Sequence, residues 1–323
     1  MIEPDLLHDC YMPFSRFIAK QGFVVLDGGM GTELAIRGAD VTDELWSARL
    51  LRDDPGIIRQ IHYDYFAAGA DVATTASYQA TFQGFEKVGI GYDEAASLIR
   101  KSVEIAVEAR DAFWLVQDSR AGREKPLIAA SIGPYGAFLA DGSEYRGFYG
   151  LSVRELADFH RDRLAALVQT RADMLAFETV PCPEEAEAYV RLLEEGEAKP
   201  AWISFSCKDG LSVCQGVPFE RCIDIVAGSP QIVAIGVNCT APEHVESLIR
   251  AARSRTDKAI IVYPNSSEIW DARRRTWVSP AHGPVKPADF APQWFEAGAR
   301  IIGGCCRTGI ADIRALRTRL LQK

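Results

Sequence analysis

Short apolar runs alternate with longer amphipathic segments along most of this chain. Each run is rich in Val, Ile, Leu and Ala and stops at a glycine or a polar residue, which is typical of β-strands that are buried on both faces. Eight runs of this kind are present, and we expect a strand at each of them: 23–26, 71–75, 127–132, 173–177, 201–205, 232–237, 259–262 and 300–302.

Helical patterns lie between these runs. Two of them, at 55–68 and 287–297, end on the same signal, Ala-Gly-Ala followed by a charged residue, where a glycine closes a helix and a strand begins. The alternation of strands and helices predicts right-handed βαβ units and a parallel sheet. Helices are predicted at 55–68, 92–113, 153–170, 183–195, 242–253 and 287–297.

Eight strand–helix units in 323 residues favour a closed α/β barrel, the (β/α)8 TIM barrel, over an open doubly wound sheet. No stretch rich in Pro, Ser and Gly and no run of like charges divides the chain. The sequence therefore predicts one barrel domain over residues 21–323, preceded by an N-terminal extension over residues 1–20.

Composition narrows the class of partner. The chain is 48% hydrophobic and 25% charged, and its formal net charge is −8. That balance argues against nucleic acid or an anionic membrane as a partner, because both select clustered Lys and Arg. No window approaches the roughly 18–20 apolar residues of a membrane span, and the first residues do not resemble a signal peptide. We therefore expect a cytoplasmic protein whose cysteines stay reduced.

Distinctive polar residues follow the predicted strands. Asp27, Glu178, Asn238 and Cys239 each come directly after a strand, and so does the pair Cys305-Cys306. In a (β/α)8 barrel the carboxyl ends of all strands meet at one face, where active sites lie. Residues far apart in the sequence are therefore expected to be neighbours there.

Three of these residues are candidate metal ligands. Cys239 ends the sixth strand and Cys305-Cys306 end the eighth, so their side chains can converge over the barrel mouth. Three thiolates suit a borderline cation such as Zn²⁺, and the missing fourth protein ligand leaves the open position of a catalytic site. Gly303 and Gly304 before the pair indicate backbone that bends tightly or approaches another segment closely.

The spacing alone leaves other roles open. A cysteine at a strand end can simply pack in the core, and Cys305-Cys306 could form a vicinal disulfide or a redox switch in a non-catalytic barrel. A structural zinc site would need a fourth ligand, for which Cys207 and His282 are the candidates.

The residues around the cysteines resemble the homocysteine S-methyltransferase family, from about residue 24 to residue 316. Within it, they look most like the subgroup that uses S-methylmethionine as the methyl donor. Phe148 and Ser267 depart from the family pattern, which often has an acidic residue and a glycine there. The segments that carry the resemblance are LDGGMGTEL (26–34), ELWSARLL (44–51), TASYQATFQGFE (75–86), GPYGAFLADGSEYRG (133–147), FETVP (177–181), GVNC (236–239), IVYPNSSEIWD (261–271) and GGCCRT (303–308).

The resemblance implies a zinc-dependent methyl transfer from S-methylmethionine to the thiolate of homocysteine, giving methionine, in a TIM barrel. It implies zinc on Cys239, Cys305 and Cys306, with no further catalytic residue. Substrate-binding candidates hold the amino acid end of homocysteine, position it, or face the donor with an aromatic ring: Asp27, Gly28, Gly29, Glu178, Asn238, Trp46 and Tyr78. Phe82 and Tyr135 are further aromatic candidates.

Alternatives within this chemistry stay open. The donor could be S-adenosylmethionine or betaine, and the acceptor could be selenocysteine or selenohomocysteine. Cobalamin is not expected, because 323 residues leave no room for the additional domains that bind it.

Overall fold

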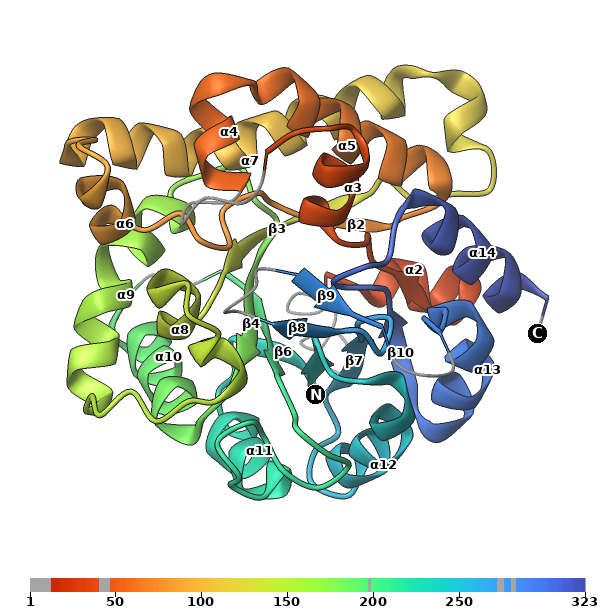
Figure 1. Cartoon of the computed structure of the whole chain (residues 1–323). Helices are drawn as coiled ribbons and strands as arrows, with labels where there is room; N and C mark the ends of the chain where they lie inside the picture. The colour runs from red at the N-terminus through yellow and green to blue at the C-terminus, as the bar shows by residue number, and fades with distance from the viewer. Residues whose placement is uncertain (1–12, 41–46, 197–198, 272–275, 280–282, 323) are drawn as a thin grey trace, which may run out of the picture.

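The computed structural model describes residues 13–40, 47–196, 199–271, 276–279 and 283–322. Within them, eight parallel strands form one sheet in the order β1-β10-β7-β6-β5-β4-β3-β2, and a parallel bridge between Leu26 and Val72 joins β1 to β2. The sheet thereby closes into the predicted (β/α)8 barrel, with helices outside it (Figure 1). The strands are β1 (Val24–Val25), β2 (Val72–Thr74), β3 (Leu127–Ile132), β4 (Met174–Val180), β5 (Ala201–Phe205), β6 (Ile232–Asn238), β7 (Ala259–Tyr263) and β10 (Ala299–Ile302).

The six predicted helices are confirmed, and Gly69 and Gly298 terminate two of them with φ of 116° and 122°. The prediction missed two outer helices, α11 and α14. In α11 the buried residues Phe219, Cys222 and Val226 have helical spacing, so the signal was present but short. The longer helices are α5 (Pro55–Ala68), α7 (Tyr92–Leu115), α9 (Val153–Val168), α10 (Pro183–Glu195), α11 (Phe219–Ala227), α12 (Pro242–Arg253), α13 (Pro287–Ala297) and α14 (Ile310–Leu321).

Shorter helices occupy the N-terminal segment and the loops that follow the strands, and one, at 117–120, lies between α7 and β3. None of them was predicted, because each is too brief to show a helical period. They are α2 (Ser15–Gln21), α3 (Met30–Ile36), α4 (Ser47–Asp53), α6 (Phe82–Lys87), α8 (Tyr135–Leu139) and the 3₁₀ turns η1 (Gln117–Arg120) and η2 (Ser143–Tyr145).

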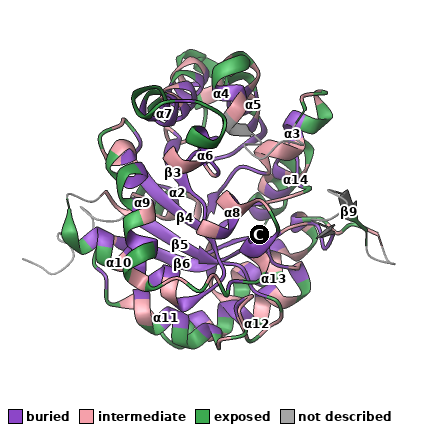
Figure 2. Cartoon of the chain, turned by 60° about the vertical axis from the view of Figure 1, so that its left-hand side comes forward, coloured by how far each residue is buried: buried purple, intermediate pink, exposed green. Residues whose placement is uncertain are grey.

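Alternate strand residues belong to two separate apolar clusters. Trp202 and Ile261 lie in the cluster inside the barrel, whereas their neighbours Ile203 and Ile260 pack in the larger cluster between strands and helices. Figure 2 shows the buried strands at the centre and the exposed faces of the helices on the outside. This division explains the continuous apolar runs in the sequence, since both faces of every strand are covered.

Helix α2 lies at the end of the barrel where the strands begin. Phe14 and Phe17 are buried with the first inward residues of the strands, and the ring of Phe14 is 6.4 Å from that of Trp202. The segment before β1 therefore contributes to the core inside the barrel. The boundary predicted between residues 20 and 21 stays a prediction, and it falls inside α2.

Two details differ from the predicted strands. Strand β4 continues to Val180, so Glu178 lies within it, and its register against β5 shifts between Phe177 and Val180. An antiparallel hairpin of β8 (Ile269–Asp271) and β9 (Thr276–Val278) follows β7, and it was not predicted. No helix among the described residues is long and apolar enough to cross a membrane.

Candidate active site

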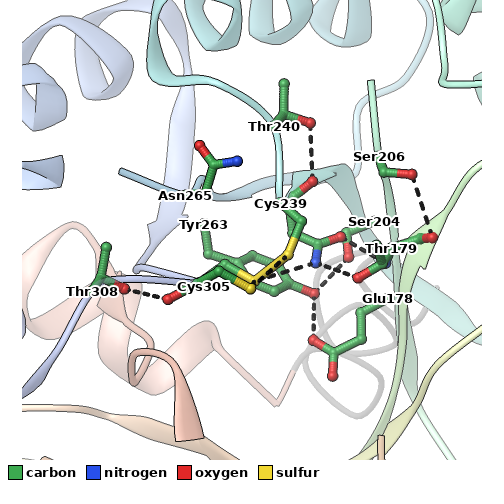
Figure 3. Close-up of a disulfide and its surroundings, with 12 residues drawn as sticks. Glu178, Thr179, Ser204, Ser206, Cys239, Thr240, Tyr263, Asn265, Cys305 and Thr308 are labelled. Atoms are coloured by element: carbon green, nitrogen blue, oxygen red, sulfur yellow. Dashed lines mark hydrogen bonds between the residues drawn. A yellow bond between two sulfur atoms is a disulfide. The ribbon is translucent and has the colours of Figure 1, made fainter. Parts of the chain in front are cut away.

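Cys239, Cys305 and Cys306 meet at the carboxyl end of the barrel, as the sequence predicted. The Cys306 sulfur lies 3.8 Å from that of Cys239 and 3.9 Å from that of Cys305, and all three sulfurs lie within 4.8 Å of one another. A disulfide joins Cys239 to Cys305 (Figure 3). The alternative of a vicinal disulfide between Cys305 and Cys306 is wrong, because Cys306 is a free thiol.

Glycines allow the loop that carries two of these cysteines to lie directly against the end of β1. A Cβ on Gly303 would come 2.5 Å from Cβ of Leu26, and one on Gly29 would come 2.7 Å from the carbonyl oxygen of Cys305. The amide of Gly29 also donates to the carbonyl of Thr308 over 2.9 Å. The predicted close approach is confirmed, and it joins Asp27-Gly28-Gly29 to the cysteine loop.

No fourth ligand joins the cysteine cluster in the part of the chain that the structure describes. Cys207 is buried but is not part of this group. His282, the other candidate, lies outside the described residues. Among the described residues, three convergent sulfurs without a fourth ligand match the donor set of a catalytic rather than a structural zinc site.

Asn238 fixes the position of the backbone beside Cys239. Its Oδ1 accepts from the amide of Thr179 over 2.7 Å, and its Nδ2 donates to Oγ1 of Thr179 over 2.8 Å. Nδ2 also lies 3.9 Å from the Cys305 sulfur. Thr179 and Cys239 both have left-handed backbone, with φ of 62° and 46°. The two strained strand ends are therefore held together by one buried amide.

Asp27 and Glu178 place two buried carboxyls beside the cysteines. Asp27 accepts from the amide and the hydroxyl of Thr74, over 2.9 and 3.1 Å. Burial raises its pKa well above the usual range, and the nearby Glu178 adds to the shift. Burial likewise raises the pKa of Glu178 to about 7, although hydrogen bonds from Ser131 and Tyr263 oppose the shift. Carboxyls in such a setting favour a cationic partner.

The aromatic candidates separate into two groups. Tyr78 is half-buried and interacts electrostatically with Glu178 and Cys306, so it lies at the site. Phe82 stacks on Tyr92 with ring centroids 4.4 Å apart, and Tyr135 packs in a cluster of aromatic rings, so both have structural partners elsewhere. Trp46 lies outside the described residues.

The structure brings residues to the site that the sequence reading did not single out. Glu144 and Tyr145, on η2, interact electrostatically with Cys306. Burial raises the pKa of Glu144 to about 7. Both belong to the EYRG segment at 144–147, so the motif was visible in the sequence, but its position across from the cysteines was not.

The two departures from the family pattern lie in loops. Ser267 has φ of 66°, which explains why glycine is usual there, and its hydroxyl donates to Glu243 over 3.1 Å. Phe148 also has positive φ, 58°, and its ring is 73% exposed.

Comparison with known proteins gives one consistent result. Residues 24–320 match the family model for homocysteine S-methyltransferase. The chain is 51% identical to the homocysteine S-methyltransferase YbgG of Bacillus subtilis, over 94% of this chain and 96% of that protein. It is 45% identical to the selenocysteine Se-methyltransferase of Brassica oleracea var. italica, over 94% of this chain and 90% of that protein.

Solved structures agree with the sequence relatives. The metallated and the oxidised crystal forms of the homocysteine methyltransferase MmuM from Escherichia coli each superpose with a TM-score of 0.85 at 44% identity, covering 95% of this chain and 99% of theirs. The fold, the cysteine cluster and these matches lead to one conclusion. This chain is a methyltransferase and belongs to the homocysteine S-methyltransferase family.

Proposed function

We propose that this protein transfers a methyl group from S-methylmethionine to homocysteine, and that Cys239, Cys305 and Cys306 hold the zinc ion that the reaction requires. The observation that carries the proposal is the convergence of three sulfurs within 4.8 Å of one another, with no fourth ligand in the cluster among the described residues. Relatives named as homocysteine S-methyltransferases support the acceptor.

The charge of the donor set suits this chemistry. Zinc, when bound, would take the substrate thiol as its fourth ligand and deprotonate it at neutral pH. Three cysteine thiolates already exceed the charge of one Zn²⁺, so the substrate sulfur stays electron-rich and nucleophilic. Neutral histidine ligands would withdraw more electron density from that sulfur. The disulfide between Cys239 and Cys305 must be reduced before both sulfurs can act as ligands.

Asp27 and Glu178 would bind the ammonium group of homocysteine. Both are buried at the strand ends beside the cysteines, and an ammonium supplies the cation that their setting favours. Gly28 and Gly29 would keep this turn against the cysteine loop. Asn238 would position the backbone of Cys239 rather than bind substrate, because both ends of its amide are hydrogen-bonded to Thr179.

The donor needs a methyl group on a good leaving atom in line with the homocysteine sulfur. A sulfonium meets this need because it departs as a neutral thioether, and two bound substrates held in line can supply much of the rate. The ring of Tyr78 would face such a cation, and we keep Trp46 as a second candidate. Methionine would then form from both substrates.

The test is an assay of reduced, zinc-loaded protein with homocysteine and three donors in parallel: S-methylmethionine, S-adenosylmethionine and betaine. We expect about one zinc per chain and the highest methionine yield from S-methylmethionine. Betaine as the best donor would refute the proposed donor. An arm with selenocysteine as acceptor is included, because the selenocysteine relative is as similar as several homocysteine enzymes.

Metal dependence has its own variants. Cys239→Ser should lose zinc and activity together, whereas Cys222→Ala, a buried free cysteine outside the cluster, should keep both. Full activity of Cys239→Ser without bound metal would rule out the proposed role of zinc.

A further inference from the structure

Glu144 is a buried carboxylate for which the chemistry above has no use. It lies on η2, in the loop after β3, and only 6% of its surface is exposed. In the part of the chain that the structure describes, its Oε2 is buried without a hydrogen-bond partner. Burying an ionised carboxylate without a partner costs several kcal/mol. Such a group indicates a cation that the protein itself does not supply.

The carboxylate lies near the reaction site. Glu144 interacts electrostatically with Cys306, Tyr78 and Tyr145, which come from three different loops at the ends of the strands. Its backbone is fixed, because Ser206 donates to the Glu144 carbonyl over 3.0 Å. A Cβ on Gly136 would also overlap the η2 backbone, so the loop packs closely. The backbone that carries Glu144 is therefore already held in place beside the site.

Nearby charged residues that the structure describes do not pair with the Oε2 of Glu144. Arg146 is 59% exposed, and its guanidinium donates to Asp141 over 3.2 Å and to the hydroxyl of Ser143 over 3.0 Å. Its remaining effect on Glu144 is outweighed by burial and by Asp141, and the pKa of Glu144 rises to about 7. A bound cation at Glu144 would reverse this shift.

Two cations of the donor could occupy this position, its α-ammonium or its sulfonium. The ammonium offers three N–H donors to a carboxylate whose Oε2 has no hydrogen-bond partner among the described residues, whereas a sulfonium offers none. The sulfonium charge also disappears as the methyl group leaves. A carboxylate against it would stabilise the ground state more than the transition state and slow the reaction. The ammonium charge does not change, so binding it costs no rate.

We propose that Glu144 binds the α-ammonium group of the methyl donor and thereby selects sulfonium donors that are α-amino acids. This assignment rests on the proposed methyl transfer to homocysteine. It gives each amino acid its own anionic partner: Asp27 and Glu178 serve the acceptor, and Glu144 serves the donor.

The experiment compares two donors that differ only in the amino group: S-methylmethionine and 4-(dimethylsulfonio)butanoate. In Glu144→Gln we expect kcat/KM for S-methylmethionine to fall about ten- to a hundredfold, the usual effect of losing a charged hydrogen bond. The value for the deaminated donor and the KM for homocysteine should stay within about twofold. Asp118→Asn, an exposed carboxyl on η1, is the control and should change neither donor.

Several results would overturn the assignment. An equal loss for both donors would place Glu144 at the sulfonium or in a structural role, and a raised KM for homocysteine would place it at the acceptor. An unchanged kcat/KM for S-methylmethionine in Glu144→Gln would rule out the role of Glu144, although the proposed function would stand. If the parent protein used betaine alone as a donor, both the role of Glu144 and the proposed function would be wrong. If Glu144→Gln does not fold, the test is made on the parent protein. Its kcat/KM for S-methylmethionine must then exceed that for the deaminated donor by at least about tenfold, or the assignment is wrong.

Discussion

Asn238 and Thr179 exchange two buried hydrogen bonds, one at each end of the Asn238 amide, across the ends of β6 and β4. Each of them adjoins a residue of the site: Cys239 follows Asn238, and Glu178 precedes Thr179. The pair therefore fixes the distance between a sulfur ligand and a substrate carboxylate. This explains how two chain segments that lie 59 residues apart in the sequence keep one geometry.

Asn238→Ala removes both bonds and leaves the buried amide of Thr179 without its acceptor. Because partners of metal ligands commonly affect metal affinity or activity by 10- to 100-fold, we expect a loss of about that size in zinc affinity and in kcat/KM. Chelator competition measures the first and methionine formation the second. Asn238→Asp keeps the acceptor for the Thr179 amide, so its zinc affinity and kcat/KM should lie between those of the parent and those of Asn238→Ala. Zinc affinity and activity equal to the parent would show that the pair does not position Cys239.

Arg163→Met should destabilise the protein strongly. The buried guanidinium donates to the Gly133 carbonyl over 2.6 Å and contacts His160, which bonds Glu185 over 2.8 Å. Its loss breaks this buried network and removes a positive charge that opposes the burial of Glu185, and breaking a buried network of this kind costs about 3–5 kcal/mol. Urea unfolding measures the change. Arg154→Met on the same helix is the control, because Arg154 is 80% exposed and should matter little. Equal stability of both variants would contradict the prediction.

His62→Leu should remove one source of acid instability. His62 is fully buried, and neither ring nitrogen has a hydrogen-bond partner among the described residues. Burial lowers its pKa to about 4. Between pH 6.5 and 4 the His62 imidazole binds a proton in the unfolded chain but not in the folded protein. The free energy of unfolding therefore falls as pH falls. The shift corresponds to at most about 3 kcal/mol.

Melting temperatures of the two proteins from pH 7 to pH 4 check this. The parent should lose more stability than His62→Leu across that range, and the variant should be no less stable at pH 7, since leucine leaves no buried polar atom unpaired. Parallel curves would show that His62 does not titrate differently in the folded and unfolded states.

Gly236→Ala should prevent β6 from pairing with β7. A Cβ at Gly236 would overlap the carbonyl oxygen of Ile261, which is backbone and cannot turn aside. We expect a loss of at least about 3 kcal/mol or no soluble barrel, measured by yield and thermal melting. Gly228→Ala is the control: its φ is −76° and nothing lies near the added Cβ, so it should be neutral or slightly stabilising. A fully stable Gly236→Ala would refute this packing.

The barrel itself could be predicted from the order of apolar and polar residues. Both faces of each strand are covered, so β7, and β6 as far as Val237, are continuous runs without a polar residue, and strand–helix alternation leaves few topologies. The three cysteines could be predicted as a group for the same reason, because a barrel brings its strand ends to one face. Local sequence does not encode the hairpin of β8 and β9 as clearly, since its strands have only three residues each.

The sequence by itself thus determined the fold class and the three sulfurs, because both depend on strand order and on residue type at strand ends. Tertiary structure alone decided which groups face one another. The clamp of Asn238 on Thr179 and the unpaired carboxylate of Glu144 near Cys306 each join segments at least 59 residues apart. Such contacts depend on register, left-handed backbone and loop packing to within an ångström, which periodicity and spacing along a chain do not specify.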